Sequence, residues 1–97
     1  MPGITFHVDA AVEMQAAARY YEEQQRGLGA AFLAEIEQGL NRIQQFSRLW
    51  PIYDAEYRRY LLRRFPFGII YRLDTEGIVV VAVAHLRREP GYWKDRG

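Results

Sequence analysis

The C-terminal half of the chain alternates between apolar runs and turn signals at short intervals. Runs rich in β-branched, aliphatic and aromatic residues at 57–64, 69–73 and 78–84 are separated by Phe65-Pro66-Phe67-Gly68 and by Asp74-Thr75-Glu76-Gly77. Such runs between proline- and glycine-containing turns are typical of consecutive antiparallel strands. The run 78–84 is the most apolar, which predicts an interior strand covered on both faces. The arginine-rich run 57–64 is predicted to form an edge.

The N-terminal half shows a helical period instead. Residues 10–25 and 30–46 carry apolar side chains at spacings of three and four, which predicts two amphipathic helices. Asp9 is expected to cap the first helix, because its carboxylate can accept hydrogen bonds from the free amides of the next turn. Gly27 is expected to take the left-handed conformation that closes this helix. The short connection between the helices predicts an antiparallel hairpin.

The remaining segments complete the predicted fold. Residues 4–8 alternate between apolar and polar side chains, which predicts a short strand with His7 on its exposed face. Residues 47–56 are expected to be a loop around Trp50-Pro51, since the residue before proline avoids helical geometry. Neither helix can bury its apolar stripe alone, so both require a sheet. We therefore predict an α+β fold of order β-α-α-β-β-β, with a helical hairpin on a small, mostly antiparallel sheet. How the first strand joins that sheet does not follow from the pattern.

Composition narrows the class of protein. A chain of 97 residues is expected to form one domain, spanning 1–97. It has no cysteine, which excludes disulfides, thiolate metal sites and cysteine nucleophiles. The N-terminus does not resemble a signal peptide, and the longest apolar run is far shorter than the roughly 20 residues that span a membrane. We expect a cytoplasmic protein without membrane contact.

The charge is unevenly distributed. Residues 1–56 carry four arginines and eight acidic side chains, whereas 57–97 carry nine basic and four acidic ones. Twelve of the thirteen basic residues are arginine, either because of codon usage or because guanidinium groups suit phosphate and carboxylate. The basic C-terminal half predicts an anionic partner, which is either nucleic acid or an acidic protein segment.

One cluster carries candidate chemistry. Neither a glycine-rich phosphate loop nor a set of metal ligands at suitable spacing is present in the sequence, and we expect no metal and no cofactor. Ionisable and aromatic residues gather after the last predicted strand: His85, Arg87, Arg88, Tyr92, Trp93 and Lys94. Two interpretations stay open. The cluster is a nucleic-acid site, or its aromatic residues fix the C-terminus on the sheet while the arginines are solvated.

A set of short motifs suggests a family. The motifs, in chain order, are Ala18-Arg19-Tyr20-Tyr21-Glu22, Gly27-Leu28-Gly29 with Phe32, Tyr57-Arg58-Arg59, Arg64-Phe65-Pro66-Phe67 with Ile70-Tyr71, His85 to Arg88, and Pro90-Gly91-Tyr92-Trp93. Together they resemble the RelE/ParE superfamily, the toxins of bacterial type II toxin–antitoxin modules, and most of all its ParE or plasmid stabilisation branch. The resemblance implies the β-α-α-β-β-β fold and a tight complex with a small antitoxin.

The resemblance implies one of two activities. RelE-like members cut mRNA on the ribosome, and ParE-like members poison DNA gyrase. Metal-independent RNA cleavage would use His85, Arg87 and Tyr92 as catalytic residues. The lysine-rich strand of that branch is absent, as Lys94 is the only lysine. Growth arrest by gyrase inhibition is therefore favoured, mRNA cleavage is the alternative, and a non-enzymatic nucleic-acid-binding module is the rival from another class.

The resemblance and the basic C-terminal half together predict two binding surfaces. The surface predicted to bind the target or nucleic acid consists of Arg63, Arg64, Arg87, Arg88, Trp93 and Lys94. The antitoxin is predicted to bind Arg58, Arg59 and Tyr60 on the strand predicted to form the edge. Its C-terminal segment, disordered when free, is expected to add a helix and an extended strand, with acidic side chains that meet the arginines.

Overall fold

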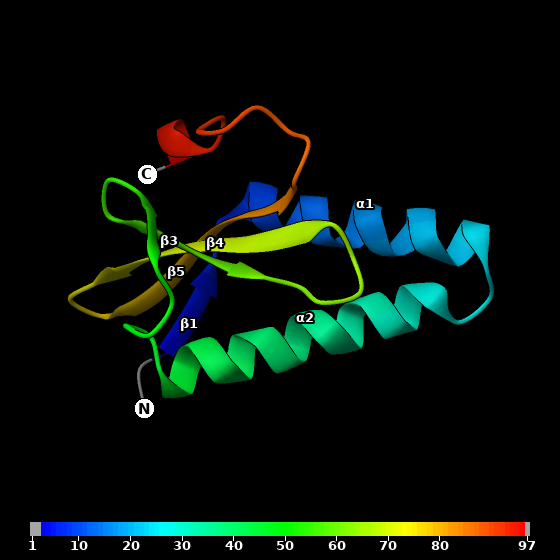
Figure 1. The fold of residues 1–97 in the computed structure, drawn as a ribbon, viewed down its shortest axis with the longest axis horizontal. Coiled ribbons are helices and arrows are strands. Elements are labelled where there is room, and N and C mark those ends of the chain that lie inside the picture. The colour runs from blue at the N-terminus through cyan, green and yellow to red at the C-terminus, as the bar shows by residue number, and fades with distance from the viewer. Residues whose placement is uncertain (1–2, 97) are drawn as a thin grey trace.

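A helical hairpin covers one face of a five-stranded sheet in the computed structural model, which describes residues 3–96 (Figure 1). The elements are β1 (Gly3–Phe6), α1 (Val8–Gln24), α2 (Leu28–Gln45), β2 (Ile52–Asp54), β3 (Tyr57–Leu61), β4 (Phe67–Asp74), β5 (Gly77–His85) and the short 3-10 helix η1 (Lys94–Arg96). The predicted α+β class and the hairpin on the sheet are confirmed. The element order gains one strand, β2, inside the segment predicted to be a loop.

The strand order is β1-β5-β4-β3-β2. Strand β1 pairs in parallel with β5, and the other neighbours are antiparallel. The interior position predicted for 78–84 is confirmed, since β5 lies between β1 and β4. The edge position predicted for 57–64 is wrong, because β2 pairs with β3. Ala55 takes a positive φ of 51° and so allows the chain to reverse tightly between these two strands.

The helices pack on the sheet through an apolar core. Its largest fully buried members include Phe32, Ile36 and Ile43 of α2, which face Ile69 and Tyr71 of β4. Two glycines of α2 allow close approach. A Cβ on Gly29 would lie 2.5 Å from the Ala18 carbonyl oxygen of α1, and one on Gly39 would lie 2.8 Å from the Tyr60 ring.

The opposite face of the sheet has a smaller core. Val81 is an extra residue in β5, because Val80 pairs with Tyr71 while Ala82 pairs with Ile70. This bulge places both Val81 and Ala82 in the second core. Trp93 closes that core, and its ring centre lies 4.6 Å from that of Tyr57.

The ends of the helices differ in part from the prediction. His7, not Asp9, caps α1: its Nδ1 accepts a hydrogen bond of 3.1 Å from the Asp9 amide. Asp9 lies inside the first turn because β1 ends at Phe6 and the helix begins sooner than predicted. The left-handed conformation of Gly27 is confirmed, with φ of 86°. The Glu22 carboxylate accepts the amides of Gly27 and Gly29 and so joins the end of α1 to the start of α2.

Candidate functional site

Strand β5 extends beyond its parallel partner, which leaves part of one edge without a neighbouring strand. The pairing ends at Phe6 opposite Val80. The His7 amide then donates to the Val80 carbonyl at 2.9 Å, and the chain turns into α1. Helix α1, not a strand, therefore accompanies the second half of β5.

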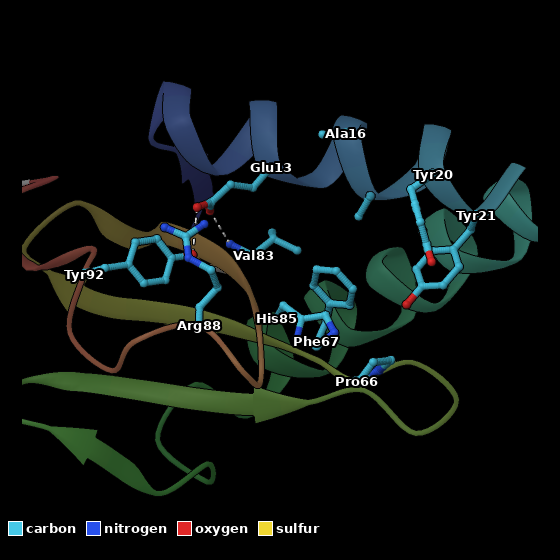
Figure 2. Close-up of a pocket in the computed structure, with 11 residues that line it drawn as sticks. Glu13, Ala16, Tyr20, Tyr21, Pro66, Phe67, Val83, His85, Arg88 and Tyr92 are labelled. Carbon is cyan, nitrogen blue, oxygen red and sulfur yellow. Dashed lines mark hydrogen bonds between the residues drawn. The ribbon is translucent and has the colours of Figure 1, made fainter. Parts of the chain in front are cut away.

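The Glu13 carboxylate of α1 occupies this edge (Figure 2). Its Oε1 accepts the Val83 amide at 3.0 Å, and its Oε2 accepts the Tyr92 hydroxyl at 2.7 Å. Arg96 forms two hydrogen bonds of 3.0 Å to the same carboxylate, and a third from Nη1 to the Val81 carbonyl. Side chains from near both ends of the chain thus replace a missing strand and attach the C-terminal segment to α1.

This network shifts the pKa values of two of its members. Burial raises the pKa of Tyr92, and the hydrogen bond to Glu13 raises it further, so the phenol holds its proton tightly. Burial alone would lower the pKa of Arg96. The hydrogen bond and the charge of Glu13 outweigh burial, so the pKa of Arg96 is raised.

A groove of about 560 Å³ lies next to the network, between α1 and the end of β5; we call it the α1–β5 groove. Its helix side is formed by Ala16, Ala17 and Tyr20, and its sheet side includes Phe67, Val83 and His85. Figure 2 shows Tyr20 extending from α1 toward the groove, and Arg88 lying close to Tyr92. The walls are mostly apolar, with a few polar groups, which suits a binding site.

Three residues of the predicted cluster line this groove: His85, Arg88 and Tyr92. His85 is half-buried, its ring meets Phe67 edge-on at 5.1 Å, and its Nδ1 accepts the Arg87 amide at 3.0 Å. The Arg88 guanidinium lies 3.9 Å from the centre of the Tyr92 ring, a cation–π geometry. The Arg87 side chain is exposed and does not line the groove.

Two members of the predicted target surface have partners within the protein: Trp93 is buried, and Lys94 forms an ion pair at the surface. Trp93 is 1% exposed and belongs to the second core, so its ring does not form an open contact surface. The Lys94 ammonium lies 2.6 Å from the Asp54 carboxylate and thereby links the C-terminal segment to β2. The alternative role for the aromatic residues, fixing the C-terminus on the sheet, describes Trp93 correctly.

Arg63 and Arg64 lie apart from this cluster. Both side chains are exposed, and the backbone amides of both residues donate to the Glu35 carboxylate of α2. Arg64 borders a shallow depression against α2, and neither arginine lines the α1–β5 groove. The structure therefore separates the predicted target surface into two places.

The side chains predicted to bind the antitoxin also have internal partners. Arg58 donates to the carbonyls of Arg48 and Trp50, and the Arg59 guanidinium lies 4.0 Å from the centre of the Tyr53 ring. Tyr60 is buried, and its hydroxyl accepts a hydrogen bond from Arg42 at 3.0 Å. The prediction required an open edge at β3, and β2 occupies that edge.

Sequence reasoning did not predict Glu13 and Arg96, which hold the site together. They are 83 residues apart, and no motif connects them. The only sequence signal in this area is the run Ala16-Ala17-Ala18, which allows another element to approach α1. Within residues 3–96 no three His, Cys, Asp or Glu side chains are placed to hold a metal ion. The helices of the same range include none long and apolar enough to cross a membrane.

The arrangement of two helices on a mixed five-stranded sheet is that of a ParE/RelE-like α+β fold. A solved structure described as the chromosomal ParDE TA system from P. aeruginosa is similar, with a TM-score of 0.64 and 15% sequence identity over 88% of this chain and 96% of that chain. No curated protein matches the sequence. The family described as the ParE toxin of type II toxin-antitoxin system, parDE, matches residues 4–90. The chain belongs to this ParE toxin family, and Tyr92 and Arg96 lie beyond the matched range.

Proposed function

We propose that this protein is the toxin of a type II toxin–antitoxin module, that an antitoxin encoded beside it is its partner, and that it arrests growth by inhibiting DNA gyrase. Membership of the ParE toxin family supports the first two parts. The choice of target depends on the chemistry available around the groove.

The state of Tyr92 is the observation that favours gyrase over RNA. Metal-independent RNA cleavage requires one group that removes a proton from the 2′-hydroxyl and another that protonates the leaving oxygen. The Tyr92 hydroxyl donates to Glu13, and its raised pKa opposes proton release at neutral pH. Arginine stays charged and cannot take over this task. Inhibition by docking on a protein needs no proton transfer.

The proposed docking surface consists of the exposed arginines Arg87 and Arg88. They follow β5 directly, and the segment that carries them is held at its far end by Trp93 and Arg96. Guanidinium groups on a fixed segment suit the bidentate recognition of carboxylates on a protein target.

Two parallel assays test the target: supercoiling by purified gyrase, and mRNA integrity after induction in a bacterial host. We expect the wild-type protein to block supercoiling and the double variant Arg87→Ala/Arg88→Ala to lose this effect. The matched control Arg26→Ala/Arg48→Ala removes two other exposed arginines and should inhibit like the wild type. Truncation of the C-terminal segment is a poor substitute, since it also removes Trp93 and Arg96.

The RNase alternative has support of its own, because His85, Arg88 and Tyr92 line one groove. It predicts that induction degrades mRNA while supercoiling is unaffected. It also predicts that His85→Ala and Tyr92→Phe, at unchanged fold by circular dichroism, abolish the degradation. That pattern would overturn the gyrase proposal.

A further inference from the structure

Three large apolar side chains are exposed between the end of α2 and strand β2. Phe46 is 57% exposed, Leu49 is 65% exposed and Ile52 is 59% exposed. The Leu49 amide donates to the Phe46 carbonyl at 2.9 Å, which closes a turn between α2 and β2. Single exposed apolar side chains are common, but several of them at one place mark a contact surface. We call these three residues the β2 patch.

The loop that carries the β2 patch is held by polar side chains of the sheet. The Tyr71 hydroxyl donates to the Ser47 carbonyl at 2.7 Å. The Arg58 guanidinium donates to the carbonyls of Arg48 and Trp50, at 3.0 and 2.6 Å. A loop that is already fixed loses little conformational entropy on binding, so the patch is preorganised for a contact.

Ile52 also presents its backbone at the outer edge of the sheet. It stands opposite Arg58 of β3, and the neighbouring Arg59 amide donates to the Pro51 carbonyl at 3.3 Å. That bond identifies Ile52 and Arg58 as a non-hydrogen-bonded pair, so the amide and the carbonyl of Ile52 point away from β3. Pro51, which has no amide donor, directs its backbone toward β3 and does not interrupt the outer edge.

A donor and an acceptor on one edge residue are complementary to a second copy of that residue. In an antiparallel ladder, two hydrogen-bonded residues exchange both of their backbone bonds. A two-fold axis at Ile52 places this residue opposite the Ile52 of a second copy, where each amide meets the other carbonyl. The same rotation brings the apolar side chains of the two patches to the same face of the joined strands.

The charges beside the patch distinguish a second copy from other partners. Arg48 precedes Ile52 by four residues, Glu56 follows it by four, and both charged side chains are exposed. Asp54 is already paired with Lys94. An acidic partner would meet the like charge of Glu56, and a basic partner would meet that of Arg48. A second copy runs in the opposite direction, so the Arg48 of each copy comes beside the Glu56 of the other.

We propose that two copies of this chain associate through their β2 edges, which joins their two sheets into one across a two-fold axis at Ile52. The two β2 patches meet beside the joined strands, and two pairs of Arg48 with Glu56 border the contact. This inference requires neither an antitoxin nor a cellular target, and its test is independent of the proposed function.

The outer edge at β1 is the competing place for a second copy. The depression beside that edge is lined by two acidic side chains, Asp74 and Glu76. A second copy there would bring like charges together. The β2 edge combines a self-complementary backbone, exposed apolar side chains and opposite charges at its two ends.

Sedimentation equilibrium of the purified full-length chain measures the association. We expect a monomer–dimer equilibrium in the micromolar range, because the contact is short. Ile52→Lys places two like charges at the axis and should weaken dimerisation about tenfold or more. Val12→Lys is the matched control, because Val12 lies on α1 and is 57% exposed, close to the exposure of Ile52. The control should associate like the wild type, and circular dichroism should show the native fold for both variants.

An exchange of charges tests the orientation of the two copies. Arg48→Glu alone sets Glu against Glu at both ends of the contact, and Glu56→Arg alone sets Arg against Arg. We expect each variant by itself to dimerise about tenfold less tightly than the wild type. An equimolar mixture of the two variants should associate again, because the mixed dimer contains two pairs of opposite charge.

Several results would overturn the proposal. One is a wild-type chain that stays monomeric up to about 1 mM. Another is a dimer that Ile52→Lys leaves intact, which would place the contact elsewhere. A mixture of the two charge variants that associates no better than either alone would exclude the antiparallel arrangement. A monomeric wild type whose Ile52→Lys variant no longer inhibits gyrase would identify the target as the occupant of the patch.

Discussion

The Glu13 carboxylate and the Tyr92 hydroxyl are joined by a hydrogen bond of 2.7 Å, although 79 residues separate them in the chain. Because Glu13 also binds the Val83 amide and Arg96, one carboxylate connects α1, the free edge of β5 and the C-terminal segment. The position of the segment that carries Arg87 and Arg88 therefore depends on a residue of the first helix.

Replacing Glu13 should destabilise the protein. Glu13→Ala leaves the Val83 amide and the Arg96 guanidinium without their acceptor, and we expect a loss of about 2–3 kcal/mol in the free energy of unfolding. Urea denaturation measures the loss. Glu23→Ala, at an exposed position of the same helix, is the control and should change stability by less than about 0.5 kcal/mol. Equal losses for both variants would show that the network does not stabilise the fold.

Trp93 should behave as a core residue. Trp93→Ala removes a fully buried ring that packs on Tyr57, and we expect it to cost about 3–5 kcal/mol. Trp93→Phe keeps an aromatic ring in the same space and should recover much of this loss. Thermal and urea denaturation of the two variants give the comparison. A stable Trp93→Ala protein would contradict the burial of this ring and would return Trp93 to the surface that binds the target.

The secondary structure was largely predictable, because long periodic segments produce strong patterns. Strand β2 was missed since it has three residues, follows Trp50-Pro51 and reverses at Ala55, whose positive φ no pattern indicates. The cap at His7 was missed because aspartate is a preferred helix cap, which pointed to Asp9. In the structure the Nδ1 of His7 accepts the amide hydrogen bond instead. The cap at His7 depends on where β1 ends, and strand β2 depends on its pairing with β3. Both are properties of the tertiary structure.

The candidate site was predictable only where its residues are neighbours in the sequence. His85, Arg88 and Tyr92 follow the last strand closely, so their clustering was expected, and the groove contains all three. The partnership of Glu13 with Arg96 depends on the parallel pairing of β1 with β5 and on β1 being shorter. This topology brings α1 beside the free edge of β5.

The helical hairpin should not tolerate a side chain at Gly29. The added Cβ of Gly29→Ala would lie 2.5 Å from the Ala18 carbonyl, a backbone atom that moves only with its helix. We expect a net loss of about 1–3 kcal/mol, although alanine favours the helix itself. Gly3→Ala is the control, because nothing lies within 4 Å of its added Cβ. If differential scanning calorimetry finds Gly29→Ala as stable as wild type, the helices are packed less closely than described.

Tyr71 should make the protein lose stability in alkali. Burial raises the pKa of Tyr71 to about 12, and the nearby charge of Arg58 opposes this only in part. The folded protein therefore holds the phenolic proton more tightly than the unfolded chain, whose tyrosines titrate near pH 10. The stabilisation that results from this difference in pKa is fully present below about pH 10 and is lost as the pH rises from about 10 to about 12.

Tyr71→Phe separates this pH effect from the loss of a hydrogen bond. At pH 7 the variant should be about 1 kcal/mol less stable, because the bond from the Tyr71 hydroxyl to the Ser47 carbonyl is lost. Between about pH 10 and about 12 its stability should fall less steeply than that of the wild type, by up to about 1.4 kcal/mol per pH unit. Tyr92, whose pKa is also raised, accounts for part of the remaining slope, so Tyr71→Phe/Tyr92→Phe should be flatter still. Urea denaturation at a series of pH values tests this, and parallel profiles for wild type and Tyr71→Phe would refute it.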